Sequence, residues 1–110
     1  MSLNKTKIRS FIGVLKDARA LIVKGWARGA YARTKDNMPI EYKSSNAACF
    51  CAMGAIFKAN IKKDVLWTSE GEILTHFNDR QSTTKEHVLL MFDRSIENAK
   101  VMLSTKTEKL

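Results

Sequence analysis

The sequence predicts a small, mainly α-helical domain of about four helices packed around one buried central helix. Three observations favour this fold: apolar residues recur at helical spacing near both ends of the chain, residues 47–57 form one apolar run, and 110 residues contain a single proline. A chain of this length forms one domain with one core. We expect that domain over residues 1–104, followed by a frayed polar tail over residues 105–110.

The first helix is predicted from about Asn4 to Lys24, and Gly25 is a natural stop after it. Its apolar face follows the i, i+3, i+4 spacing of an amphipathic helix: Ile8, Phe11, Ile12, Leu15, Ala18 and Ile22. The opposite side alternates cations with small residues: Arg9, Gly13, Lys16, Ala20 and Lys24. Such a side either lets a phosphate chain or another backbone approach closely, or is simply solvated.

Residues 25–43, GWARGAYARTKDNMPIEYK, form the longest predicted loop, with glycines, large aromatics and cations close together. The run Lys35-Asp36-Asn37 is a turn signal, and Pro39 biases the residue before it toward extended backbone. A very short hairpin between residues 30–33 and 40–42 is therefore possible. Trp26 and Tyr31 can either contact a partner or fold inward onto the core.

The second helix is predicted to begin at Ser45 or Asn46, either of which can cap it, and to end near Asn60. Residues 47–57 are apolar on every side of such a helix, so we expect it to be the buried central element.

Two capping-box patterns follow, Ser69…Glu72 and Thr83…Glu86. The first predicts a short helix, and the second predicts the last helix, from about residue 84 to 103. The main apolar face of that last helix comprises Val88, Phe92, Ile96, Ala99 and Leu103. Leu90 and Val101 lie on nearly the opposite side, which suggests a self-association surface and a homo-oligomer.

The formal charge of +8 is confined to the first third of the chain. Residues 1–35 carry nine Lys or Arg and one Asp, whereas residues 36–110 carry ten basic and ten acidic residues. This asymmetry favours an anionic partner, either an acidic protein or a nucleic acid, and a merely solubilising surface remains the alternative. The candidate binding residues are Arg9, Lys16, Lys24, Trp26, Arg28, Tyr31 and Arg33.

Cysteine and histidine are too sparse to indicate a metal or redox site. Cys49 and Cys51 are two apart, not in a CxxC pair, and no second cysteine pair exists, so we expect no metal and no cofactor. A thiol nucleophile at Cys51, with His76 or His87 as base and Asp79 as orienting group, can be drawn. An apolar surrounding would however raise the thiol pKa and leave it inert, so we do not expect an enzyme.

No apolar run reaches the roughly 20 residues of a membrane span, and charges interrupt any signal-peptide core. We therefore expect a cytoplasmic protein that does not enter a membrane, with both cysteines as free thiols.

Several motifs together resemble one family: GWARGAYAR (25–33), Pro39, CAMGAI (51–56), FND (77–79) and VLLMFDRSI (88–96). They resemble a family of short bacterial and phage proteins known only as a domain of unknown function. The resemblance covers roughly residues 21–99, and its signature falls on Trp26, Gly29, Ala30, Tyr31, Ala32, Arg33, Cys51, Gly54, Ala55, Asn78 and Asp79. It implies a shared fold and no activity.

The resulting hypothesis is a small, phage-encoded, non-enzymatic binding protein that engages an anionic or acidic macromolecule through its first helix and the 25–43 loop. The alternatives are a nucleic-acid-binding protein, a structural subunit, and a small-molecule or thiol site around Tyr31, Arg33, Cys51 and Asp79. An Arg33–Asp79 pair, with Tyr31 and Asn78 beside it, would either lock the loop or line a pocket, and locking is the simpler account.

Overall fold

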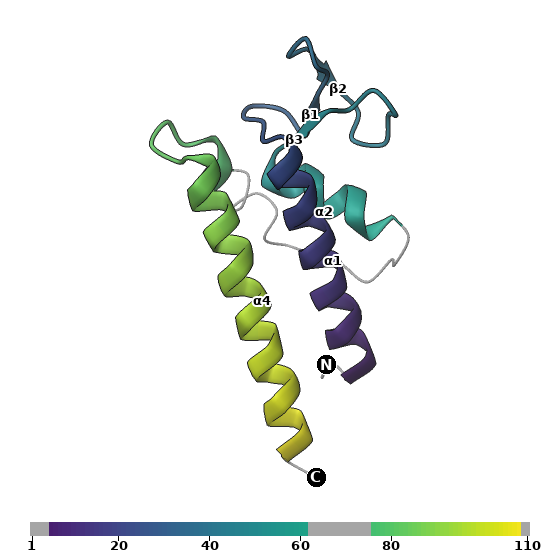
Figure 1. The fold of residues 1–110 in the computed structure, drawn as a ribbon, viewed down its shortest axis with the longest axis vertical. Coiled ribbons are helices and arrows are strands. Elements are labelled where there is room, and N and C mark those ends of the chain that lie inside the picture. Colours follow the sequence, from purple (N-terminus) through teal and green to yellow (C-terminus); the bar gives the residue numbers. More distant parts are fainter. Residues whose placement is uncertain (1–4, 62–75, 109–110) are drawn as a thin grey trace.

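The computed structural model describes the backbone of residues 5–61 and 76–108 and the side chains of that range up to residue 104 (Figure 1). It confirms a mainly α-helical domain that carries a small antiparallel sheet. The named elements are α1 (Lys5–Lys24), β1 (Ala32–Arg33), β2 (Pro39–Ile40), β3 (Cys49–Phe50), α2 (Ala52–Asn60) and α4 (Lys85–Glu108). Residues 76–79 are also helical.

The two long helices, α1 and α4, lie side by side and antiparallel, with the sheet at one end of the pair (Figure 1). Each presents the apolar face that its sequence period predicts. On α1 the buried residues are Ile8, Ile12, Val14, Leu15, Ala18 and Ile22, and on α4 they include Val88, Phe92, Ile96 and Ala99. Both predicted helix faces are confirmed in the main, although Phe11 and Leu103 are only partly buried and Val14, outside the predicted face, is fully buried. The main core lies between these two helices and α2.

The second helix begins later than predicted, because its first residues belong to the sheet. Cys49 and Phe50 form β3, and α2 begins only at Ala52, with Cys51 as its N-cap. The Cys51 sulfur accepts a hydrogen bond from the Gly54 N–H over 3.3 Å. Only residues 52–56 of α2 are buried, whereas 57–60 are half-buried, so the expectation of a helix buried on every side holds for its first half alone.

The predicted hairpin exists and is extended by a third strand that sequence reasoning missed. The strand order is β2-β1-β3, both pairs are antiparallel, and Ala32 lies opposite Ile40 on one side and Phe50 on the other. Phe50 also forms a parallel bridge with Trp26, which fixes the start of the 25–43 loop against the sheet.

The last helix starts one residue later than the predicted capping box requires. Thr84 and His87 bond reciprocally: the Thr84 N–H donates to His87 Nδ1, and the His87 N–H donates to the Thr84 hydroxyl, each over 3.2 Å. Thr83 is buried, and its hydroxyl donates to the Phe77 carbonyl over 2.7 Å instead. α4 continues to Glu108, past the predicted end near residue 103 and into the expected tail.

The start of the short helix predicted from Ser69 lies outside the described residues, and residues 76–79, at its predicted end near Phe77, are helical. In the part of the chain that is described, no helix is both long enough and apolar enough to cross a membrane.

Candidate functional site

Three signature residues, Trp26, Gly29 and Asp79, converge around one buried amide, that of Asn78. Its side-chain oxygen accepts from Trp26 Nε1 over 2.7 Å and from the Ala52 N–H over 2.9 Å. Its Nδ2 donates to the Ala27 carbonyl over 3.0 Å and to Asp79 Oδ1 over 2.9 Å. Asn78 is fully buried, and all four hydrogen-bonding positions of its amide are occupied. It therefore ties the loop to the N-terminus of α2, which is a structural role.

Asp79 completes this arrangement, which we call the loop clasp (Trp26, Gly29, Asn78 and Asp79). The Gly29 N–H donates to Asp79 Oδ1 over 2.9 Å. Gly29 has a φ of +80°, a left-handed conformation that glycine adopts without steric cost and that lets the chain turn at this point. One carboxylate oxygen thus holds both the turn and the Asn78 amide.

Arg28 is directed back onto the protein. Its guanidinium carbon lies 4.9 Å from the centre of the Trp26 ring, and an Nη group donates to the Thr83 carbonyl. The cation thereby covers the indole and links the loop to the segment just before α4. The guanidinium therefore occupies a face of the Trp26 ring on which a base could otherwise stack.

Arg33 does not pair with Asp79, and this prediction is wrong. Its Nε donates to the Arg28 carbonyl over 3.1 Å, and its Nη1 donates to the Asn37 carbonyl over 2.9 Å. The guanidinium therefore joins the loop to the turn of the β1–β2 hairpin. Asp79 is occupied by Gly29 and Asn78, so locking of the loop, the simpler account, is achieved by different partners.

Cys51 is enclosed and held as a thiol. It is 1% exposed, and its N–H donates to the Tyr31 carbonyl over 3.1 Å. Burial raises the pKa of the Cys51 thiol, and the charge of Asp79 acts in the same direction, against backbone hydrogen bonds that lower it. A protonated, enclosed sulfur is a poor nucleophile. This geometry gives no support to the predicted thiol site.

Tyr31 lies elsewhere, beside Phe57 of α2. Its side chain is about half exposed, and its ring stands edge-on to Phe57 with centroids 5.6 Å apart. Together with Ile40 and Tyr42 it lines a surface depression of about 560 Å³. Arg33, Cys51 and Asp79 do not line that depression, so the predicted small-molecule cluster is not brought together.

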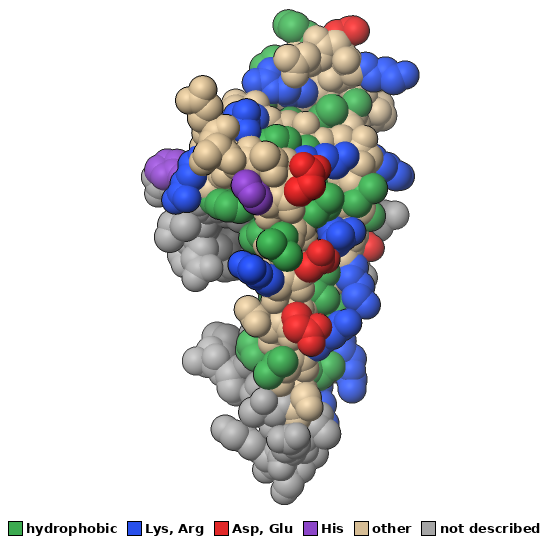
Figure 2. All heavy atoms as spheres, turned by 60° about the vertical axis from the view of Figure 1, so that its left-hand side comes forward, with side chains coloured by type: hydrophobic (Ala, Val, Ile, Leu, Met, Phe, Trp, Pro, Cys, Tyr) green, Lys and Arg blue, Asp and Glu red, His purple; other side chains and the backbone are tan. Residues whose placement is uncertain are grey.

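The candidate cations of α1 are arranged differently from those of the loop. Arg9, Lys16 and Lys24 are all exposed, and we call them the cationic face of α1. Arg19, on the side toward α4, pairs with Asp93 over 2.6 Å. Figure 2 shows Lys and Arg side chains in a column along one edge of the molecule, with Asp and Glu side chains in a separate line beside it.

Within residues 5–61 and 76–108, no three His, Cys, Asp or Glu side chains lie close enough together to hold a metal ion. Sequence reasoning missed three contacts of this site: the Ala52 N–H and the Ala27 carbonyl with Asn78, and the Thr83 carbonyl with Arg28. These three residues act through backbone atoms, so their residue types give no signal. The Trp26–Asn78 bond had one: a buried indole N–H needs an acceptor, and Asn78 belongs to the same signature.

More than half of the chain matches a known protein family. Residues 9–68 match a protein family described as a family of unknown function (DUF6197). The matched segment contains α1, the sheet and α2, but not Asn78 or Asp79. No curated protein and no solved structure matches the chain.

Proposed function

This chain belongs to the DUF6197 family of unknown function, and we propose that it is a non-enzymatic binding protein that engages an extended polyanion through the cationic face of α1. One observation carries the proposal. Arg28 and Arg33 of the 25–43 loop are used within the protein, whereas Arg9, Lys16 and Lys24 are exposed and have no acidic partner among the described residues.

The spacing of this face supports an extended rather than a compact ligand. Arg9, Lys16 and Lys24 are seven and eight residues apart, so at 1.5 Å per residue they are separated by about 10 to 12 Å along the helix. Gly13 and Ala20 lie between them and add little bulk. A nucleic-acid backbone or an acidic polypeptide can meet all three cations, whereas a single small anion can meet only one.

The contacts that Trp26 makes within the protein support binding of nucleic acid without recognition of the base sequence. The indole N–H of Trp26 is used by Asn78, and its ring is covered by Arg28. Base stacking through this residue would require the loop clasp to open. We therefore propose that contact with a nucleic acid is limited to phosphates. A bacterial or phage origin and a cytoplasmic location belong to the same proposal, supported by the motif resemblance and by two free cysteines.

The test is fluorescence anisotropy of a labelled 20-base-pair duplex, a single strand and poly-glutamate at low salt. Three phosphate contacts predict that log K for the duplex falls with log salt with a slope of about −3. Lys16→Gln should weaken binding and reduce the magnitude of that slope by about 1. The matched control is Lys100→Gln, which removes the same charge from an exposed position on α4.

Two results would overturn the proposal. One is flat anisotropy with all three probes at low salt. The other is equal weakening by Lys16→Gln and Lys100→Gln, which would show an effect of net charge without a defined face. Binding of poly-glutamate but not of either oligonucleotide would keep the cationic face and assign it to an acidic protein.

A further inference from the structure

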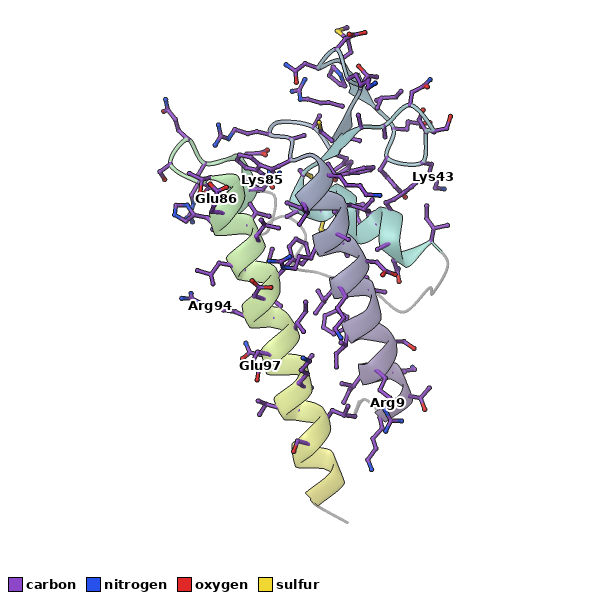
Figure 3. The ribbon with its side chains drawn as sticks, viewed as in Figure 1. Arg9, Lys43, Lys85, Glu86, Arg94 and Glu97 are labelled. Carbon is purple, nitrogen blue, oxygen red and sulfur yellow. The ribbon has the colours of Figure 1, made fainter. Side chains whose placement is uncertain are left out.

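The side of α4 that points away from the core carries two exposed apolar residues. Leu90 is 46% exposed and Val101 is 57% exposed. They are eleven residues apart, close to three turns, and so lie on one side of the helix, opposite Val88 and Phe92. Between them lie Arg94 and Glu97, both exposed. Figure 3 shows these two charged side chains extending from α4 on the side away from α1. We call Leu90, Arg94, Glu97 and Val101 the outer face of α4.

The outer face of α4 is complementary to itself. Positions 90 and 101 have the same midpoint as positions 94 and 97. When two copies of α4 are placed antiparallel about that midpoint, Leu90 meets the partner's Val101, and Arg94 meets the partner's Glu97. Because the arrangement has two-fold symmetry, each of these contacts occurs twice. We propose that this face is the interface of an antiparallel homodimer.

Charge favours a second copy of this chain over another partner. Arg94 and Glu97 cancel each other on the outer face, and neither has an ion-pair partner within the described residues. The antiparallel arrangement gives both a partner of opposite sign, whereas a parallel arrangement would bring like charges together. The cationic face lies on α1, so Arg9, Lys16 and Lys24 do not oppose the approach of two α4 helices.

The shape of the surface agrees with this docking. A depression of about 320 Å³ lies on α4, lined in part by His87, Leu90, Met91 and Arg94. It adjoins Leu90, where the partner's Val101 would sit. A single helix pair buries less surface than most stable complexes, so we expect a weak dimer whose population depends on concentration.

The experiment is sedimentation equilibrium of the full chain over a wide concentration range. The native chain should show a mass that rises toward that of a dimer. Arg94→Glu and Glu97→Arg, each alone, should be monomeric because like charges would then face each other. An equimolar mixture of the two variants should associate again, since every facing pair in the mixed dimer has opposite signs. The double variant Arg94→Glu/Glu97→Arg should also dimerise.

Two further variants separate the interface from general effects. Leu90→Ser should weaken association at least tenfold while the circular dichroism of the helices is unchanged. Lys43→Glu, which makes the same charge change as Arg94→Glu but in the loop before α2, should associate like the native chain (Figure 3). A native chain that stays monomeric at every concentration would overturn the proposal. So would a dimer that Arg94→Glu does not weaken, or a variant mixture that stays monomeric.

Discussion

The indole N–H of Trp26 and the side-chain oxygen of Asn78 lie 2.7 Å apart, although 52 positions separate the two residues in the sequence. The same oxygen accepts the N–H of Ala52, the first residue of α2. One amide thus fixes an aromatic of the 25–43 loop and the start of a helix at the same time. The loop is therefore anchored on the protein before any partner arrives.

Removal of the Asn78 amide should be among the most costly single changes in this protein. Asn78→Ala leaves the Trp26 N–H, the Ala52 N–H and the Ala27 carbonyl without their partner in a buried site. We expect the free energy of unfolding to fall by about 2–4 kcal/mol, measured by urea denaturation. The matched variant Trp26→Phe, which removes only one donor, should cost less.

A double-mutant cycle between these two positions tests the bond itself. The two losses should be less than additive, with a coupling of about 0.5–3 kcal/mol. Strict additivity would show that Trp26 and Asn78 stabilise the fold independently, against the loop clasp described above.

Gly54→Ala should destabilise the protein through a backbone clash. A Cβ at this position would lie 1.9 Å from the Tyr31 carbonyl oxygen, so β1 and α2 would have to move apart. We expect a loss of about 2–3 kcal/mol in urea denaturation. Gly29→Ala makes the same atomic change where the nearest atom is the flexible end of Arg33 at 3.4 Å, and it should cost only the strain of its positive φ, about 1 kcal/mol. A reversed order of the two losses would contradict the close approach.

Cys51 should make stability fall at alkaline pH. Burial raises its pKa above the ordinary value of 9.0, so the unfolded chain releases this proton at a lower pH than the folded chain does. The contribution is fully present below the unfolded pKa and is lost as pH rises through the folded pKa. Cys51→Ser, which keeps a capping oxygen, should flatten the loss above pH 9 relative to the native chain, as followed by urea denaturation at several pH values.

Arg33→Lys should lower stability without weakening the binding of a polyanion. A lysine keeps the charge but cannot reach the Arg28 and Asn37 carbonyls together, as the planar guanidinium does. We expect a loss of about 1 kcal/mol in thermal or urea unfolding, because the site is only partly buried. If binding in the anisotropy assay fell while stability stayed constant, Arg33 would be a ligand contact and not a structural one.

The start of α4 distinguishes two capping schemes. Thr84→Ala should cost about 1 kcal/mol, because the hydroxyl of Thr84 accepts the His87 N–H. Glu86→Ala should cost much less, since Glu86 is exposed and is not part of the observed cap. Equal losses, measured by urea denaturation, would favour the capping box that the sequence pattern predicts.

The two long helices, each of which packs by one apolar face, were predictable from the sequence. Of the sheet, only the β1–β2 hairpin was predictable, and β3 was not. α1 and α4 each have a strict apolar period, which two-helix packing then uses directly. Residues 47–57 are apolar throughout, so periodicity cannot distinguish a helix from a buried strand there. The choice is made by pairing with β1, through contacts such as the Ala48 N–H to the Arg33 carbonyl at 2.8 Å, which no local pattern reveals.

The candidate site shows a related limit. Trp26 and Gly29 of the loop bond to Asn78 and Asp79 of the FND motif, whereas Tyr31 and Arg33, the expected partners, do not. Opposite charge was therefore the wrong guide to the pairing. Arg33 and Asp79 each bond to backbone groups of a tight loop, which must be satisfied wherever that loop is packed. The sequence shows which charged side chains are present. The positions of the backbone carbonyl and amide groups with which they bond are determined only by the fold.

Asn78 lies outside the segment that matches the family, although it is part of the hydrogen-bonded unit that holds this segment. The family match ends at residue 68, yet the GWARGAYAR segment inside it is held by an amide ten residues further on. A chain that ended with the match would retain Trp26 and Gly29 but lose the acceptors for both of their N–H groups. The unit recognised by its sequence is thus smaller than the unit that can satisfy its own hydrogen bonds. Work on related proteins should therefore look for an equivalent amide or carboxylate beyond the recognised segment before that segment is expressed alone.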